Sequence, residues 1–220
     1  MNDWIIWQLA DSAFPSGGFA HSGGLEAAWR AGHVSDEPAL ERQLKTMLHQ
    51  CAYATAPLSL WAYREPDRWA EADGLCDLVL NHPISNRASR AQGRGLLASA
   101  AEIYPSAGIS ELRQGIMDRR APGHFAPAFG AICRQLEIKI DRVAALFLFI
   151  NLRGGVSAAV RLGIVGPLVA QSIQFRLTQV AEQLALAAAK IEPDDVAQTA
   201  PVADLLQACH DRLYSRLFQS

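Results

Sequence analysis

The sequence predicts an all-α fold: a single bundle of about ten helices in which residues 1–220 form one domain. Apolar residues recur at the spacing of one helical face in several segments, and alanine is frequent. No segment shows the alternation of β-branched and polar residues that marks a half-buried strand. No linker, low-complexity stretch or solenoid-length repeat divides the chain, so the helices are expected to share one core.

The first long helix is predicted over residues 36–52. Asp36 is a suitable N-cap, and Pro38 suits the first turn, where a missing N–H is tolerated. The apolar residues that follow fall on one stripe, made of Leu40, Leu44, Met47, Leu48 and Cys51. Pro57 is predicted to kink or end this helix, because proline cannot donate an intrahelical hydrogen bond.

Glycine, proline and capping residues place the next boundaries. They predict a helix capped by Ser85 that runs to about Ala101, loops over residues 104–110 and 120–123, and a helix over residues 124–137.

Residues 140–185 are predicted to form the most buried layer. Its first helix covers residues 140–160 and is expected to be interrupted at Gly154 and Gly155. The longest helix is expected to follow Pro167 and to end near Pro193, with an apolar stripe of Ile173, Leu177, Val180 and Leu184. A last helix is predicted from the series Val202, Leu205, Leu206, Cys209, Leu213 and Leu217.

Charge and hydropathy exclude several classes of protein. The chain carries 20 basic and 22 acidic residues, a formal net charge of −2, whereas phosphate binding needs a concentrated basic surface. Nucleic acid is therefore not an expected partner. The longest uncharged apolar stretch, residues 143–150, is far shorter than the roughly 20 residues of a spanning helix, and no signal sequence is recognisable. The sequence predicts a cytoplasmic protein that does not enter a membrane.

Metal-ligating residues show no spacing typical of a metal site. The 4 cysteines are widely separated and are expected to be reduced thiols. His49 and Cys51 lie two residues apart on a helix, about 200° around it, so they cannot converge on one ion. No metal or cofactor site is therefore expected in this chain, although nickel contacts shared across an interface stay open as an alternative.

Residues 15–26, here called the glycine corner, contain the densest run of glycines in the chain. Gly18 and Gly23 have the spacing of a phosphate-binding loop, but the lysine that such a loop needs is missing. Ser22 resembles the nucleophile of a GxSxG elbow, which leaves a small serine hydrolase as an alternative, although no supporting sheet is predicted. The favoured interpretation is a helix–turn–helix corner capped by Ser22 or Gly23, with a surface suited to packing against another protein.

Residues 211–220, here called the tail, are predicted to dock on a partner protein. Chain ends are usually polar, whereas this one mixes apolar and aromatic side chains with arginine, the composition of interface hot spots. The alternative is that the last helix folds back onto the core, and docking on a partner is favoured for residues 214–220.

A third surface feature is an arginine face on the helix that follows Ser85. Arg87, Arg90 and Arg94 are spaced so that they share one side of that helix. This face is either solvated or a docking site for an acidic partner.

Taken together, these segments resemble the UreF family of urease accessory proteins. Residues 15–26 resemble the family signature Gly-Gly-Phe/Tyr-x-His-Ser-x-Gly-Leu-Glu, and residues 85–94 resemble its central helix. Residues 149–168 resemble its buried core helix and turn, and residues 214–220 resemble its Tyr-Ser-Arg-Leu-Phe-x-Ser ending. Ser16 stands where the family is expected to have Thr or Val, and Asn151 stands where some members carry His. Neither departure touches the signature that begins at Gly17 or the C-terminal ending.

The resemblance implies a non-enzymatic, usually dimeric chaperone scaffold for nickel insertion. Such proteins bind UreD (also called UreH) and the GTPase UreG, and the assembly acts on apo-urease. Nickel and GTP would be handled by the partners, and this chain would modulate GTP hydrolysis on UreG; a nickel-storage protein is the remaining alternative. The partner-interface residues implied by the resemblance are Gly17, Gly18, Phe19, His21, Ser22, Glu26, His210, Asp211, Tyr214, Arg216, Leu217 and Phe218.

Overall fold

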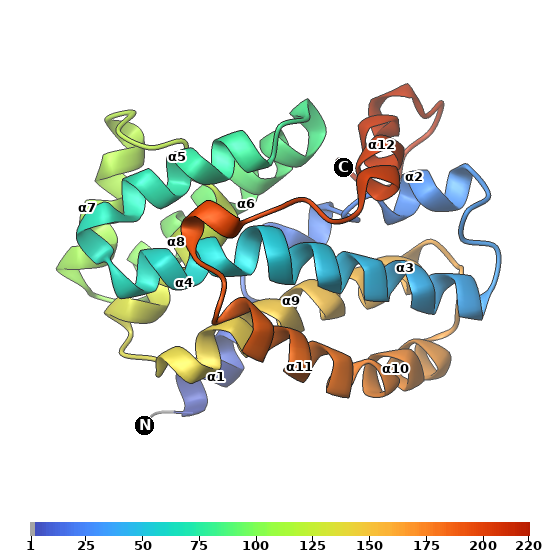
Figure 1. Cartoon of the computed structure of the whole chain (residues 1–220), viewed down its shortest axis with the longest axis horizontal. Coiled ribbons are helices and arrows are strands. Elements are labelled where there is room, and N and C mark those ends of the chain that lie inside the picture. The colour runs from blue at the N-terminus through green and yellow to red at the C-terminus, as the bar shows by residue number, and fades with distance from the viewer. Residues whose placement is uncertain (1–2) are drawn as a thin grey trace.

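The computed structural model describes residues 3–220, so the first two residues of the predicted domain, Met1 and Asn2, lie outside the described residues. Every regular element in this range is a helix, which confirms the all-α prediction (Figure 1). The α-helices are α1 (Asp3–Ala10), α2 (Leu25–Arg30), α3 (Glu37–Gln50), α4 (Ala56–Arg64), α5 (Trp69–Val79), α6 (Pro83–Ile103), α7 (Ala107–Met117), α8 (Phe125–Gln135), α9 (Ile140–Arg161), α10 (Pro167–Arg176), α11 (Thr178–Ala188) and α12 (Pro201–Ala208). Short 3₁₀ turns lie at Gly18–Ala20, Pro66–Arg68, Pro193–Asp195 and His210–Arg212, and a π turn lies at Cys51–Thr55.

Helices α3 and α4 follow each other directly through the π turn, and α3 begins where the predicted cap places its start. The Asp36 carboxylate accepts a hydrogen bond from the N–H of Ala39 at 2.8 Å, which confirms it as the N-cap of α3. Pro57 lies in the first turn of α4 and cannot donate to the carbonyl of Tyr53 one turn earlier. That carbonyl instead accepts the N–H of Ala197 at 3.1 Å, so the proline creates a binding point for a distant segment.

The core is built around α9. Its side chains are buried on several faces. Phe147 stacks on Phe125 of α8 at a ring-centre distance of 5.6 Å and packs at a tilt against Phe129 at 5.5 Å. The predicted interruption at Gly154 and Gly155 is wrong, because α9 continues through both. A Cβ at Gly155 would lie 2.6 Å from Leu44 of α3, so this glycine lets two helices approach closely.

Among residues 3–220, α9 is the one helix long and apolar enough to cross a membrane. Of its most apolar window, 56% is buried inside the fold, which is the pattern of a core helix.

Several predicted boundaries are corrected. His82, rather than Ser85, is the N-cap of α6, and its ring accepts the N–H of Ser85 at 3.3 Å. The predicted loop at 104–110 is short because α7 begins at Ala107. The expected longest helix is divided into α10 and α11 at Leu177, whose side chain is buried (2% exposed). The longest helix is instead α9.

The predicted last helix ends at Ala208, because the chain turns there toward the glycine corner. A segment after α11 crosses α3 and α4 and brings α12 beside α2 (Figure 1). Gln50 holds this segment: its side-chain oxygen accepts the N–H groups of Thr199 and Ala200 at 2.7 and 2.8 Å, and its amide donates to Asp204 at 2.9 Å. The crossing segment thereby brings the C-terminal residues next to α2, near the N-terminal end of the chain.

Candidate functional site

The glycine corner and the tail, the two motifs that the sequence singled out separately, contact each other. The N–H of Gln219 donates to the carbonyl of Ala20 at 2.8 Å, and the N–H of Ser22 donates to the carbonyl of Ser220 at 2.6 Å. In Figure 1 the C-terminus lies close to α2 and α12. Residues nearly the whole chain apart therefore form one site.

Glu26, in the first turn of α2, is the centre of this site. Its carboxylate is 0% exposed and accepts the N–H of Leu217 at Oε1 and the N–H of Phe218 at Oε2, at 2.7 and 3.0 Å. The Nε2 of His210, which is also 0% exposed, lies 3.2 Å from Oε2. A buried carboxylate is tolerated only when hydrogen bonds replace its lost hydration, and here all of these bonds come from the chain end.

Ser22 also binds the chain end. Its hydroxyl donates to the carbonyl of Ser220 at 2.8 Å and accepts the N–H of Glu26 at 3.3 Å. The N-cap of α2 is Gly24, at φ 85°, so the prediction of Ser22 or Gly23 as the cap is wrong. The Ser22 hydroxyl nevertheless accepts the N–H of Glu26 in the first turn of α2. A Cβ on Gly24 would lie 3.0 Å from Gln207 of α12, which adds a steric reason for glycine.

His21 is the residue of the corner that lies near Arg87 on the arginine face of α6. Its Nδ1 is 2.7 Å from the Ser220 hydroxyl. Burial, with Arg87 and His210 nearby, lowers the pKa of His21 below the usual histidine value, so the ring is neutral at neutral pH. A neutral ring can exchange a hydrogen bond with a hydroxyl in either direction.

Arg161, at the end of α9, joins the two motifs through their aromatic rings. Its guanidinium carbon lies 3.6 Å from the ring centre of Phe19 on the corner and 4.3 Å from that of Phe218 on the tail. Arg161 also donates to the backbone carbonyl of Phe19. Phe218 is 4% exposed, whereas Phe19 is 68% exposed. One cation–π pair is thus buried and the other faces solvent.

Part of the tail folds back onto its own chain, which is the alternative that the sequence left open, and docking of residues 214–220 on a partner stays a prediction. Phe218 and Ser220 are buried against the corner of the same chain, and so is His210 just before the tail. Tyr214 and Leu217 point outward, with Tyr214 fully exposed and Leu217 half-exposed. The tail therefore combines an inner side that binds the chain itself with an outer side that carries apolar groups.

The charged residues of the tail connect it to the predicted arginine face. Asp211 accepts hydrogen bonds from Arg87 of α6 at 2.9 Å and from Arg216 of the tail at 2.8 Å. Arg94 donates to the carbonyl of Pro122, and Arg90 lies 4.0 Å from Asp77. The arginine face is therefore partly engaged within the chain, and these exposed ion pairs add little stability.

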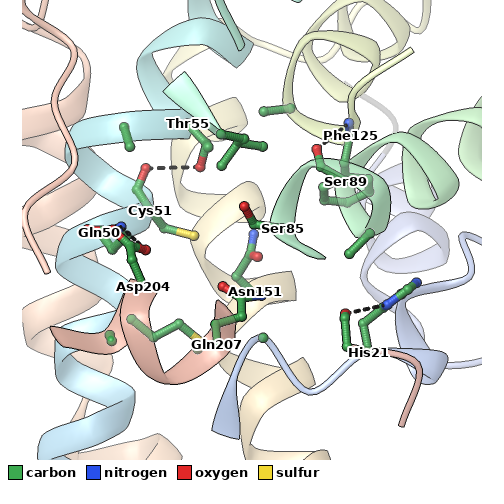
Figure 2. Close-up of a pocket in the computed structure, with 18 of the residues that line it drawn as sticks. His21, Gln50, Cys51, Thr55, Ser85, Ser89, Phe125, Asn151, Asp204 and Gln207 are labelled. Carbon is green, nitrogen blue, oxygen red and sulfur yellow. Dashed lines mark hydrogen bonds between the residues drawn. The ribbon is translucent and has the colours of Figure 1, made fainter. Parts of the chain in front are cut away.

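A pocket of about 180 Å³ lies beside the corner, between α3, the π turn and helices α6, α8, α9 and α12 (Figure 2). Its polar lining is hydroxyl, amide, thiol and imidazole groups, together with Asp204, which binds Gln50. Burial raises the pKa of the Cys51 thiol to about 11, so it stays protonated at neutral pH. Within residues 3–220 no three His, Cys, Asp or Glu side chains are close enough to hold a metal ion.

Comparison with known proteins decides the family. The sequence model of the UreF family matches residues 34–178, well over half of the chain. Urease accessory protein F of Arabidopsis thaliana is 36% identical over 221 residues, which cover 99% of this chain and 92% of that protein.

The chain belongs to the UreF family.

Further relatives agree. Urease accessory protein F of Oryza sativa subsp. indica is 34% identical over 98% of this chain and 84% of that protein, and urease accessory protein UreF of Arthrobacter sp. (strain FB24) is 31% identical over 98% of this chain and 96% of that protein. The matched family region ends at Thr178, the first residue of α11, whereas these alignments span nearly the whole chain.

A serine-hydrolase site at Ser22 does not fit this UreF-family fold. The Ser22 side chain is only 2% exposed, and its hydroxyl is already occupied by a backbone carbonyl and a backbone N–H. No strand occurs in the range 3–220, so the strand-to-helix elbow that exposes such a serine is absent from the described part of the chain. Ser22 is a structural residue of the corner.

One buried polar cluster was missed by sequence reasoning. His124, 0% exposed, lies 2.9 Å from Asp77 through Nε2 and 3.1 Å from the Ser89 hydroxyl through Nδ1. Asp73 accepts the N–H groups of Gly123 and His124 at 2.5 and 2.7 Å. Asp73 and Asp77 are one turn apart on α5, a spacing visible in the sequence, but their partners come from elsewhere. The His124 ring is not accessible to a substrate, so we interpret the cluster as structural: its hydrogen bonds join α5, α6 and the start of α8.

Proposed function

We propose that this chain is a non-enzymatic urease accessory protein that bridges UreD (UreH) and the GTPase UreG while nickel is inserted into apo-urease. Membership of the UreF family over nearly the whole chain supports the accessory role, because its relatives carry that name. The observation that carries the proposal is the outer side of the tail. Tyr214 and Leu217 are 106% and 52% exposed, although the backbone N–H of Leu217 is held by Glu26.

Such exposed groups are suited to a protein partner. A tyrosine and a leucine in water contribute nothing to the core of this chain, yet they supply the area that interface hot spots use. Arg216, held by Asp211 at 2.8 Å, adds a planar donor beside them. Phe19 of the corner is also exposed, and Arg161 joins its ring to that of Phe218 in the tail.

The finer parts of the proposal concern the assembly. UreD would bind the tail, with UreG recruited near Arg216 and its GTP hydrolysis modulated by the glycine corner. Nickel and GTP would be bound by the partners rather than by this chain, which would act as a homodimer in the cytoplasm. A scaffold changes a partner's equilibrium only through its different affinities for the partner's states, so contact surfaces are the relevant features of this protein.

The test is co-purification after co-expression with UreD and UreG. Tyr214→Ser and Leu217→Ser, singly and together, remove outward side chains while leaving the buried side of the tail intact. The double variant is expected to lose UreD capture by at least about tenfold, the size of a modest hot spot.

Matched controls are Leu78→Ser and Leu186→Ser, which remove leucines on α5 and α11 that are more exposed than Leu217. Both controls should capture UreD as the unaltered chain does. Undiminished capture by the double tail variant, with a normal helical circular dichroism spectrum, would show that the tail is not the docking surface.

A further inference from the structure

The interdependence of Glu26 and the tail carries an inference about how the partner-binding surface is formed. The hydrogen bonds of the Glu26 carboxylate come from Leu217, Phe218 and His210. Without those groups the carboxylate would be a buried charge with no compensation, which is strongly unfavourable. The tail therefore accounts for the burial of the Glu26 carboxylate.

The conformation of the tail, in turn, depends on the glycine corner. Three successive backbone N–H groups, those of residues 217, 218 and 219, donate to Glu26, to Glu26 again and to the carbonyl of Ala20. The Ser220 carbonyl then accepts both the N–H and the hydroxyl of Ser22. No regular helix covers these residues, so their conformation is set by the corner rather than by their own propensity.

This attachment determines which side chains face outward. Phe218 is turned inward against Arg161, and its neighbour Leu217 is thereby turned to solvent. Fixing the backbone of Leu217 through its N–H reduces the conformational entropy that binding would otherwise remove. The corner acts as a template on which an outward surface is built.

We propose that Glu26 is a positioning residue: it anchors residues 217–220 of the tail to the chain's own glycine corner, so that Leu217 is presented outward in a fixed place, with Tyr214 three positions earlier on the same segment. A partner that fits this surface has an apolar hollow for the two side chains, bordered by polar groups near Arg216. The inference rests on the proposed function for the partner, but the anchoring itself does not depend on it.

The anchoring is tested by amide hydrogen exchange of the full-length protein. In the unaltered chain the N–H groups of Leu217, Phe218 and Gln219 should be protected. Glu26→Gln keeps the shape but replaces one acceptor oxygen by a donor group. It should reduce the protection of Leu217 and Phe218 by on the order of tenfold or more, because a hydrogen bond to a charged group is lost.

A second variant acts from the tail and leaves α2 unchanged. Leu217→Pro removes the N–H that binds Oε1 and should release the tail even if Glu26→Gln folds poorly. Its control, Leu217→Ala, keeps the N–H and should keep the protection while losing the outward side chain. Unprotected tail amides in the unaltered chain, or full protection of Phe218 and Gln219 in both Glu26→Gln and Leu217→Pro, would overturn the anchoring.

Capture of UreD separates the two claims. Anchoring predicts that Glu26→Gln and Leu217→Pro weaken capture although both keep Tyr214. If these variants lose tail protection but capture UreD undiminished, the positioning role is wrong and the docking function stands. If the tail is protected by Glu26 but UreD is captured by no form of the chain, the anchoring stands and the docking function is wrong.

Discussion

The carboxylate of Glu26 and the backbone N–H of Leu217 are 2.7 Å apart, although 191 positions separate them in the sequence. This contact makes the two ends of the chain a single structural unit. It also explains why a glutamate is buried completely beneath a glycine-rich turn, since the hydrogen-bond donors that satisfy it arrive with the tail. Substitutions that disturb the contact between the tail and Glu26 should therefore change the free energy of unfolding.

The first prediction concerns His210, which contacts Glu26 from the turn before the tail. His210→Ala should lower the free energy of unfolding by about 2–3 kcal/mol, because it removes a buried hydrogen bond and leaves a cavity. Urea denaturation followed by circular dichroism measures this difference. Arg212→Ala, on the exposed side of the same turn, is the control and should change stability by less than about 0.5 kcal/mol.

Two glycines in core helices are predicted to respond oppositely to the same substitution. A Cβ at Gly130 of α8 would lie 2.6 Å from the carbonyl carbon of Ser59 in α4, where backbone must move. Gly130→Ala should destabilise the fold by roughly 3 kcal/mol or more.

Gly154→Ala, in α9, is the matched control. A Cβ there meets nothing within 4 Å, so alanine should raise the free energy of unfolding by about 0.5–1 kcal/mol through its better helix propensity. Thermal or urea unfolding of both variants decides the matter, and equal effects of the two substitutions would contradict the close approach of α4 and α8.

Stability is predicted to fall as the pH is lowered through the ordinary histidine range. Burial lowers the pKa of His21, His82 and His124 below the usual value of 6.5. Below that pH the unfolded chain binds more protons than the folded chain, so protonation favours unfolding. The free energy of unfolding should therefore decrease between about pH 7.5 and pH 5.5.

The variant His124→Gln isolates part of this effect. It cannot bind the proton, so the slope of stability against pH should be smaller than in the unaltered chain, whatever its absolute stability. His49→Gln, at a half-buried position where the ring stacks on Tyr53, is the control. Asp73, whose pKa is raised by burial, acts in the opposite sense, because the folded chain holds its proton more tightly than the unfolded chain. A stability that rises as the pH falls from 7.5 would count against the buried neutral histidines.

Thiol chemistry should distinguish Cys209 from the other cysteines. Cys209 is exposed, Cys76 and Cys133 are buried, and burial raises the pKa of the Cys51 thiol to about 11. Because the thiolate is the reactive form, one thiol per native chain should react rapidly with a disulfide reagent near neutral pH. Cys209→Ser should remove the rapid phase, and guanidinium should expose all 4 thiols. A rapid phase that persists in Cys209→Ser would be inconsistent with this burial pattern.

A fluorophosphonate probe should leave the native protein unlabelled, because the Ser22 hydroxyl is buried and doubly hydrogen-bonded. Active-site serines react with such probes through an activated, accessible hydroxyl. Labelling that disappears in Ser22→Ala would revive the hydrolase alternative.

Local patterns were sufficient for much of the helical framework. Asp36 and Pro38 identified the start of α3, and Pro57 identified the junction with α4, because capping and the missing proline N–H act within one turn. The same kind of reasoning failed at Gly154 and Gly155, where packing in the core outweighs the low helix propensity of glycine. It also failed at Ser85, since His82 supplied the cap three residues earlier.

The sequence by itself determined the all-α class, the family and the two motifs, because helix periodicity, turn residues and signature spacing are properties of neighbouring residues. Only the tertiary structure decided that the motifs meet, that Phe218 turns inward and that Leu217 turns outward. The physical reason is the path of the chain. A buried carboxylate must find donors wherever the fold brings them, and those that satisfy Glu26 lie in the segment after α12. The crossing segment that Gln50 holds brings them there.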